Sequence, residues 1–185
     1  MAFWDGTHGN GPWTQWGADC TRTDPCKSGC GQGEYGGYAV CNTAGTSITH
    51  VDLESSNLVG TISPLVGAWT DITYFDVCRN ALSGRVPASV GNWTKLTNFY
   101  VYGNKFEGGV LPAGLPYSQI RTGFCKLFEE HATNKFECPW PAGAKDNCVK
   151  WDHSSPQGFV PITDADCITL VSPVPRVVVE NVVIS

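Results

Sequence analysis

Apolar and polar residues alternate with a fixed period through the middle of the chain. Three six-residue blocks begin at residues 48, 72 and 96 and read ITHVDL, ITYFDV and LTNFYV. Each block has apolar residues at its first, fourth and sixth positions. This alternation predicts a short strand whose fourth and sixth side chains share the buried face. A further block begins at Ile120, so we expect four strands that begin 24 residues apart.

The segments between the strands repeat as well. LVGTI at 58–62 corresponds to LSGRV at 82–86 and to FEGGV at 106–110, and VGAW at 66–69 corresponds to VGNW at 90–93. One repeat, here called a coil, cannot enclose a core alone, so we expect the coils to stack. A coincidental series of strands and turns in a β-sandwich is the alternative, but it does not explain the strict recurrence.

Two asparagines and a serine follow the predicted strands at equivalent positions. Asn80 and Asn104 come directly after the second and third strands, and Ser56 follows the first. A buried amide at this position can bond the free backbone groups of adjacent coils, which predicts an asparagine ladder. Glycines at 60, 84 and 108 fit turns that need unusual backbone angles.

These coils resemble the plant-type leucine-rich repeat, whose pattern runs LxxLxLxxNxLxGxIPxxLGxLxx. Val86-Pro87 matches the isoleucine-proline step, whereas the first coil has Ile62-Ser63 and the third moves its proline to Pro112. The segment from Trp4 to Cys26 resembles the amino-terminal cap of that family. The resemblance covers about residues 4–148. It implies an α/β-type solenoid, a short leucine-rich-repeat array with a parallel β-sheet on the concave face and disulfide-stapled caps at both ends.

We divide the chain into four regions on this basis. They are a cysteine-rich cap (1–47), three regular coils (48–119), an irregular fourth coil with a carboxyl-terminal cap (120–148), and a carboxyl-terminal extension (149–185). Within the fourth coil, LFEEHA at 127–132 reads as an inserted helical turn, and the pattern resumes at Asn134. In the extension, SSPQG at 154–158 reads as a linker. Residues 177–184 are strongly β-prone and form either an edge strand or the start of another domain.

Eight of the nine cysteines lie toward the two ends of the chain, and Cys78 lies in the middle. They are Cys20, Cys26, Cys30, Cys41, Cys78, Cys125, Cys138, Cys148 and Cys167. This distribution predicts disulfides in both caps and an oxidising compartment. We prefer the pairs Cys26–Cys41 and Cys20–Cys30 and two bridges among the last four, although the sequence does not fix the connectivity. Cys78 is then the odd thiol.

Zinc is the alternative use for Cys26 and Cys30, which are four residues apart. The histidines (His8, His50, His131 and His153) are scattered, and none has the spacing of a second ligand pair. We therefore expect no metal and no cofactor. A net charge of −5 without a basic run excludes a nucleic-acid partner. No apolar stretch is long enough for a membrane helix, so we expect no membrane insertion in this segment. The cysteines and the sequon at Asn92 predict a secreted or cell-surface glycoprotein.

The outward strand positions define the predicted binding site. The third, fifth and seventh residues of each block should point outward together, which makes a surface that is acidic at one end and aromatic at the other. This concave face consists of His50, Asp52, Glu54, Tyr74, Asp76, Asn98, Tyr100, Tyr102, Thr122, Phe124 and Lys126, with Cys78 among them. Exposed tyrosines beside carboxylates suit a protein, peptide or glycan ligand. The alternative is that the tyrosines only pack on one another across strands.

Two other functions stay open. A carbohydrate-active enzyme could use two of the carboxylates Asp52, Glu54 and Asp76. An open sheet offers little desolvation to raise the pKa of an acid, and no nucleophile motif is present, so we expect no enzyme. A structural or adhesive component could self-associate through residues 174–185. Ice binding would need a threonine-rich flat face, which three regular coils do not supply. The resemblance implies roles such as receptor or co-receptor ectodomains, inhibitors of wall-degrading enzymes and adhesive proteins.

Overall fold

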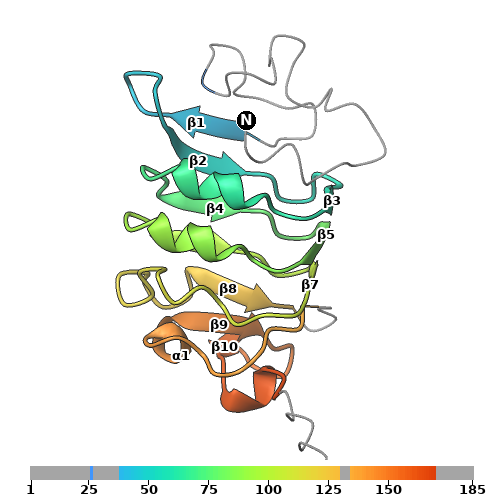
Figure 1. Cartoon of the computed structure of the whole chain (residues 1–185). Helices are drawn as coiled ribbons and strands as arrows, with labels where there is room; N and C mark the ends of the chain where they lie inside the picture. The colour runs from blue at the N-terminus through green and yellow to red at the C-terminus, as the bar shows by residue number, and fades with distance from the viewer. Residues whose placement is uncertain (1–25, 27–37, 130–133, 170–185) are drawn as a thin grey trace, which may run out of the picture.

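The computed structural model describes Cys26, residues 38–129 and residues 134–169 (Figure 1). Seven strands form the large sheet in the order β1-β2-β4-β6-β8-β9-β10. Their bounds are β1 (Tyr38–Cys41), β2 (Ile48–Asp52), β4 (Tyr74–Asp76), β6 (Asn98–Tyr100), β8 (Cys125–Phe128), β9 (Cys148–Trp151) and β10 (Phe159–Pro161). The strands follow one another down the molecule, so each coil adds one strand to the sheet.

Each regular coil returns to the sheet through a second, narrow layer. Three short strands stack beside one another, namely β3 (Val59–Gly60), β5 (Ala81–Gly84) and β7 (Lys105–Phe106). The 3-10 helices η2 (Pro64–Ala68) and η3 (Ala88–Asn92) stack in front of the large sheet in Figure 1. The remaining helices are α1 (Ala144–Asn147) and η4 (Asp164–Asp166). Among the described residues, no helix is long and apolar enough to cross a membrane.

The register of the large sheet confirms the repeat. Strands β2, β4 and β6 are parallel, and His50, Tyr74 and Asn98 are successive Cα partners. These partners are 24 residues apart in sequence, as the hydrophobic pattern predicts. The expected solenoid with a parallel sheet is therefore confirmed.

The residues at the inward strand positions form the core. Phe75, Val77 and Phe99 have no exposed surface, and the ring of Phe75 lies 4.8 Å from that of Trp93. Trp93 also donates a 3.0 Å hydrogen bond to the carbonyl of Val66, which joins two adjacent coils. Burial of each large apolar side chain contributes roughly 1.5–3 kcal/mol to stability.

The asparagine ladder runs beside this core. Asn104 is fully buried; its amide nitrogen donates to the carbonyls of Val77 and Val101, and its oxygen accepts from the N–H of Leu82. Asn80 bonds the coil before it in the same way. Asn134 continues the ladder into the irregular coil, donating to Val101 O and Leu127 O. Each amide thus satisfies backbone groups that would otherwise be buried without partners.

The fourth coil departs from the predicted register. Phe99 pairs with Cys125 and Tyr100 with Lys126, so the strand is displaced by two residues from the one expected to start at Ile120. Leu127 and Phe128 end β8 and are buried, rather than forming part of a helical turn. Cys125 still points inward, because a shift of two residues preserves the alternation of a strand.

Three disulfides lie among the described residues. Cys26–Cys41 is the predicted bridge of the first cap, Cys125–Cys148 joins the paired strands β8 and β9, and Cys138–Cys167 closes the far end. Cys78 is the free thiol, as predicted, but it is fully buried and not exposed on the concave face. The expected Cys20–Cys30 pair lies outside the described residues.

The carboxyl-terminal cap is larger than expected. Strands β9 and β10 are antiparallel, and the segment at 154–158 that reads as a linker is the turn between them. The domain boundary predicted at residue 148 therefore falls inside β9. Residues 149–169 belong to the same folded unit, whereas the β-prone segment at 177–184 lies outside the described residues.

Candidate binding face

Four strands place their outward side chains in two rows across the concave face. The first row contains His50, Tyr74 and Asn98, which are neighbours in register. The second row, here called the charged row, contains Asp52, Asp76, Tyr100 and Lys126, which are also successive Cα partners. Its charge changes from negative on β2 and β4 to positive on β8.

The two-residue displacement of β8 changes which fourth-coil residues belong to this face. Lys126 takes the place opposite Tyr100, and Phe124 precedes it with 40% of its surface exposed. Thr122 lies before the strand, and its hydroxyl contacts Asn147 at 3.4 Å. The predicted position of Thr122 on the face is therefore wrong.

Stacked rings connect neighbouring strands at the acidic end. The rings of His50 and Tyr74 are nearly parallel, with centroids 4.8 Å apart and an interplanar angle of 5°. Tyr74 then meets Tyr100 edge to face at 5.6 Å. His50 and Tyr74 are both part-exposed, so their rings offer contact area to a ligand while they hold each other in place.

Tyr100 and Tyr102 are not the exposed side chains that the sequence predicts. Each is only 9% exposed, and together they cover the fully buried Cys78. The phenol of Tyr100 also accepts a 2.8 Å hydrogen bond from Asn98. Cross-strand packing, the alternative considered from the sequence, is thus what these two tyrosines do. They support the face, and little of either is available for contact.

Aspartates end the first two strands and have a local role. Asp76 Oδ1 accepts a 2.9 Å hydrogen bond from the N–H of Cys78, and Asp52 Oδ1 accepts from the N–H of Glu54 at 3.3 Å. A short acidic side chain that bonds the backbone two residues on is a common way to begin a turn. These bonds explain why an aspartate suits both positions, but they do not neutralise its charge.

Burial perturbs one of the two aspartates strongly. Asp76 is 5% exposed, and this desolvation raises its pKa to about 6, against the opposing effect of its hydrogen bonds with Cys78. The neighbouring charges of Asp52 and Glu54 act in the same direction as burial. The expectation that an open sheet offers little desolvation to raise the pKa of an acid is therefore wrong at this position, because the tyrosines around Asp76 exclude water.

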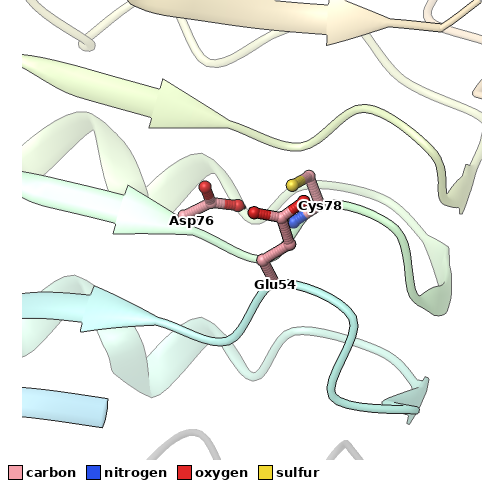
Figure 2. A group of neighbouring side chains, drawn as sticks. All are labelled: Glu54, Asp76 and Cys78. Carbon is pink, nitrogen blue, oxygen red and sulfur yellow. Dashed lines mark hydrogen bonds between the residues drawn. The ribbon is translucent and has the colours of Figure 1, made fainter. Parts of the chain in front are cut away.

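Glu54, Asp76 and Cys78 form a compact group (Figure 2). One oxygen or sulfur atom from each lies within 4.8 Å of the others. Burial raises the pKa of the Cys78 thiol, which disfavours the thiolate that a metal would need. The carboxylate of Glu54 already pairs with Arg79 at 3.0 Å. Both features work against a metal site here, so we regard the group as part of the packing of this face.

Arg79 fixes the turn beside this group. It adopts a left-handed backbone conformation with φ of 54° and pairs with Glu54 at 3.0 Å and with Glu129 at 3.3 Å. Its guanidinium lies 5.6 Å from the centre of the Tyr102 ring. This one side chain therefore links the turns that follow β2, β4 and β8, and it neutralises part of the acidic end.

The basic end includes residues that the sequence reading placed in the extension. The Lys126 ammonium lies 5.0 Å from the centre of the Tyr100 ring and 4.3 Å from that of Phe159 on β10. Phe159 in turn packs edge to face against Trp151 on β9 at 4.6 Å. Two aromatic residues on either side of the SSPQG turn were a signal for this hairpin, because such residues favour strands.

The sequon lies on another side of the molecule. Asn92 is exposed at the end of η3, and its side-chain amide donates to Gly67 O at 3.4 Å. The helix η3 lies in front of the large sheet in Figure 1. Glycosylation of Asn92 remains a prediction.

No family model and no curated protein matches this sequence. Among solved structures, the chain is similar to the leucine-rich-repeat ectodomain of the receptor kinase SOBIR1 from Arabidopsis thaliana, with 22% identity, a TM-score of 0.40 and 55% of each chain covered. It is similar to PEPR1–AtPEP1 with 19% identity, a TM-score of 0.47, and 73% of this chain and 20% of that chain covered. It is also similar to the leucine-rich-repeat ectodomain of the Arabidopsis thaliana receptor kinase GASSHO1/SCHENGEN3 in complex with CASPARIAN STRIP INTEGRITY FACTOR 2. The identity is 19% and the TM-score 0.46, with 61% of this chain and 16% of that chain covered.

The chain therefore spans about half of the SOBIR1 structure and a fifth or less of the other two. The repeat fold itself is established by the register, the asparagine ladder and the disulfides of this chain.

Proposed function

We propose that this plant-type leucine-rich-repeat solenoid is an extracellular recognition module that binds a protein, peptide or glycan, and most readily a peptide, across its concave face. The observation that carries this proposal is the part-exposed ring pair of His50 and Tyr74, which continues through Tyr100 to Lys126 on the fourth coil. Aromatic and charged side chains that cross several strands in one surface are typical of recognition sites.

The side chains of the concave face are already ordered before a ligand binds. Tyr100 and Tyr102 pack over Cys78, and the stacked rings of His50 and Tyr74 restrict each other. Side chains that are already ordered lose less conformational entropy when a partner binds. The disulfides at both ends support an extracellular setting, because such bonds persist in oxidising compartments.

A binding screen with a matched pair of variants tests the proposal. Oxidised protein would be screened against secreted proteins, peptides and a glycan array, first as the wild type and then as the double variant His50→Ala/Tyr74→Ala. We expect a selective ligand whose affinity falls at least tenfold in this variant. Leu65→Ala is the control, because Leu65 is 60% exposed on η2, away from the sheet. Equal loss of binding in both variants, or in neither, would place the site elsewhere.

The two alternative functions, an enzyme and a self-associating structural component, would each require different features of the molecule. An enzyme would need substrate to reach an acid with a raised pKa, yet Asp76 is 95% covered and already bonded to Cys78. Self-association by edge pairing is disfavoured at β10, because Pro161 has no N–H to offer another strand. Light scattering with and without residues 174–185 tests self-association directly. A concentration-dependent mass that disappears with the truncation would favour a structural role instead.

A further inference from the structure

We infer that the ligand of the concave face is an extended peptide segment that carries opposite charges about four residues apart. Its cationic group lies against Asp52, and its anionic group lies against Lys126. This inference rests on the proposed function and adds the chemistry and direction of the ligand to it.

The charged row sets the spacing. Asp52, Asp76, Tyr100 and Lys126 lie opposite one another on β2, β4, β6 and β8. Neighbouring strands are roughly 4.8 Å apart, so the row measures roughly 14 Å from its first strand to its last. Four residues of extended chain span about 13 Å. A peptide that crosses the strands can therefore meet both ends of the row with charges about four residues apart.

The charges of this row form no ion pair within the described parts of the chain. Five ion pairs occur there, namely Arg79–Glu54, Arg79–Glu129, Lys95–Asp71, Lys145–Asp164 and Lys150–Asp166. None of them includes Asp52, Asp76 or Lys126. Arg79 neutralises Glu54, whereas the charges of the charged row remain for a ligand to pair with.

Both ends of the row gain from a charged ligand. Asp52 and Asp76 are directly opposed on parallel neighbours, and like charges in this arrangement repel. A cation placed against Asp52, the more exposed of the two, relieves that repulsion. At the other end, the rings of Tyr100 and Phe159 hold the Lys126 ammonium in position without neutralising it, so it can pair with an anion.

A peptide fits this pattern better than other ligands do. A metal ion would satisfy only the acidic end, and an acidic polysaccharide would be repelled there. A neutral glycan gains nothing from the separation of charge. A peptide supplies a Lys or Arg side chain, an Asp or Glu side chain or a terminal carboxylate, and an apolar side chain beside its cationic group for the rings of His50 and Tyr74.

The test begins with selection from a phage-displayed library of linear eight-residue peptides on the oxidised, full-length chain. We expect enriched sequences to share a Lys or Arg and an Asp or Glu about four positions apart. The best peptide is then measured against Asp52→Asn, Lys126→Glu and the charge-exchanged double variant Asp52→Lys/Lys126→Glu. Asp52→Asn retains the oxygen that accepts from the N–H of Glu54, so it removes the charge alone.

We expect each single variant to lose about tenfold in affinity or more. The double variant should prefer the same peptide with its acidic and basic residues exchanged, which a variant that had merely lost its fold could not do. Lys105→Glu on the exposed part of β7 makes the same change in net charge as Lys126→Glu and should leave affinity unaltered.

Two results would overturn the inference, and they are distinguishable. Enriched peptides without the charge pair, or equal effects of Lys126→Glu and Lys105→Glu, would reject the direction and chemistry of the ligand while leaving peptide recognition intact. If no peptide is enriched and the double variant His50→Ala/Tyr74→Ala also leaves every screened ligand unaffected, both the inference and the proposed function fail.

Discussion

The N–H of Cys78 donates a 2.9 Å hydrogen bond to Asp76 Oδ1, and this contact holds a carboxylate inside a surface otherwise built from tyrosines. The bond favours the ionised acid, whereas burial favours the neutral one. Burial is the larger effect, and the pKa of Asp76 rises from 3.8 to about 6. Asp76 therefore links the stability of the molecule to pH.

We predict that Asp76→Asn changes this dependence. In the folded chain Asp76 binds its proton more tightly than in the unfolded chain, so its contribution to stability falls as the pH rises from about 4 to about 6. The amide cannot ionise, and we expect it to flatten this part of the profile and to raise the free energy of unfolding at pH 7.5 by on the order of 2 kcal/mol. Urea titrations from pH 4.5 to 7.5 measure the effect. Asp146→Asn, at an exposed site, serves as the control, and a profile for Asp76→Asn that parallels the wild type would contradict the prediction.

The asparagine ladder gives a second prediction. Asn104→Asp keeps the oxygen that accepts from Leu82 N–H but loses the two hydrogens that bond Val77 O and Val101 O. Unpaired buried groups cost about 1–3 kcal/mol each, so we expect Asn104→Asp to be severely destabilising and Asn104→Ala to cost a similar amount. Chemical denaturation measures both losses. Gln119→Ala on the exposed surface should change little, and a loss at Asn104 no larger than that of this control would show that the ladder is not needed for stability.

The turn around Arg79 gives a third prediction. Gly103 has a φ of 64°, and a Cβ there would lie 3.1 Å from the backbone of Arg79. Gly45 has nearly the same φ of 66°, but a Cβ at that position meets nothing within 4 Å. Both alanine variants pay the conformational strain, which is about 1 kcal/mol, and only Gly103→Ala adds the contact. We expect Gly103→Ala to lower the melting temperature further than Gly45→Ala. Equal decreases in melting temperature would mean that the backbone at Arg79 moves to accommodate the added Cβ without loss of stability.

A fourth prediction concerns Asn92. Expression through a eukaryotic secretory pathway should add one glycan there, visible as a loss of mass on enzymatic deglycosylation and absent in Asn92→Gln. The glycan would project from η3 and leave the concave face open, so its removal should not weaken ligand binding. An unchanged mass would reject the modification. Weaker binding after removal would instead show that the ligand reaches this side of the molecule.

Strand alternation made much of the fold predictable. The recurrence of apolar residues identifies the inward side chains of three coils, and it also places Asn80 and Asn104 where the ladder needs them. Disulfides at both ends and the free Cys78 could be predicted because cysteines cluster at the ends, although clustering alone does not determine that Cys26 pairs with Cys41. These features depend on local pattern, which a single sequence contains.

The site was harder to predict because alternation gives the direction of a side chain but not its depth. Tyr100 and Tyr102 do point to the concave face, yet neighbouring rings cover them. The displacement of β8 moved Lys126 opposite Tyr100 and removed Thr122 from the face, and no local signal marks such a shift. Phe159 reaches the face only through the β9–β10 hairpin, a contact between segments far apart in the sequence.

Both ends of the parallel stack reverse direction, since β1 is antiparallel to β2 and β10 is antiparallel to β9. Whole coils can therefore be gained or lost only between β2 and β8 without rebuilding a cap. Each added coil would lengthen the charged row by one strand, or roughly 4.8 Å. The number of coils therefore sets the length of the charged row. Proteins built on this plan could select longer or shorter ligands by duplicating or deleting one 24-residue unit.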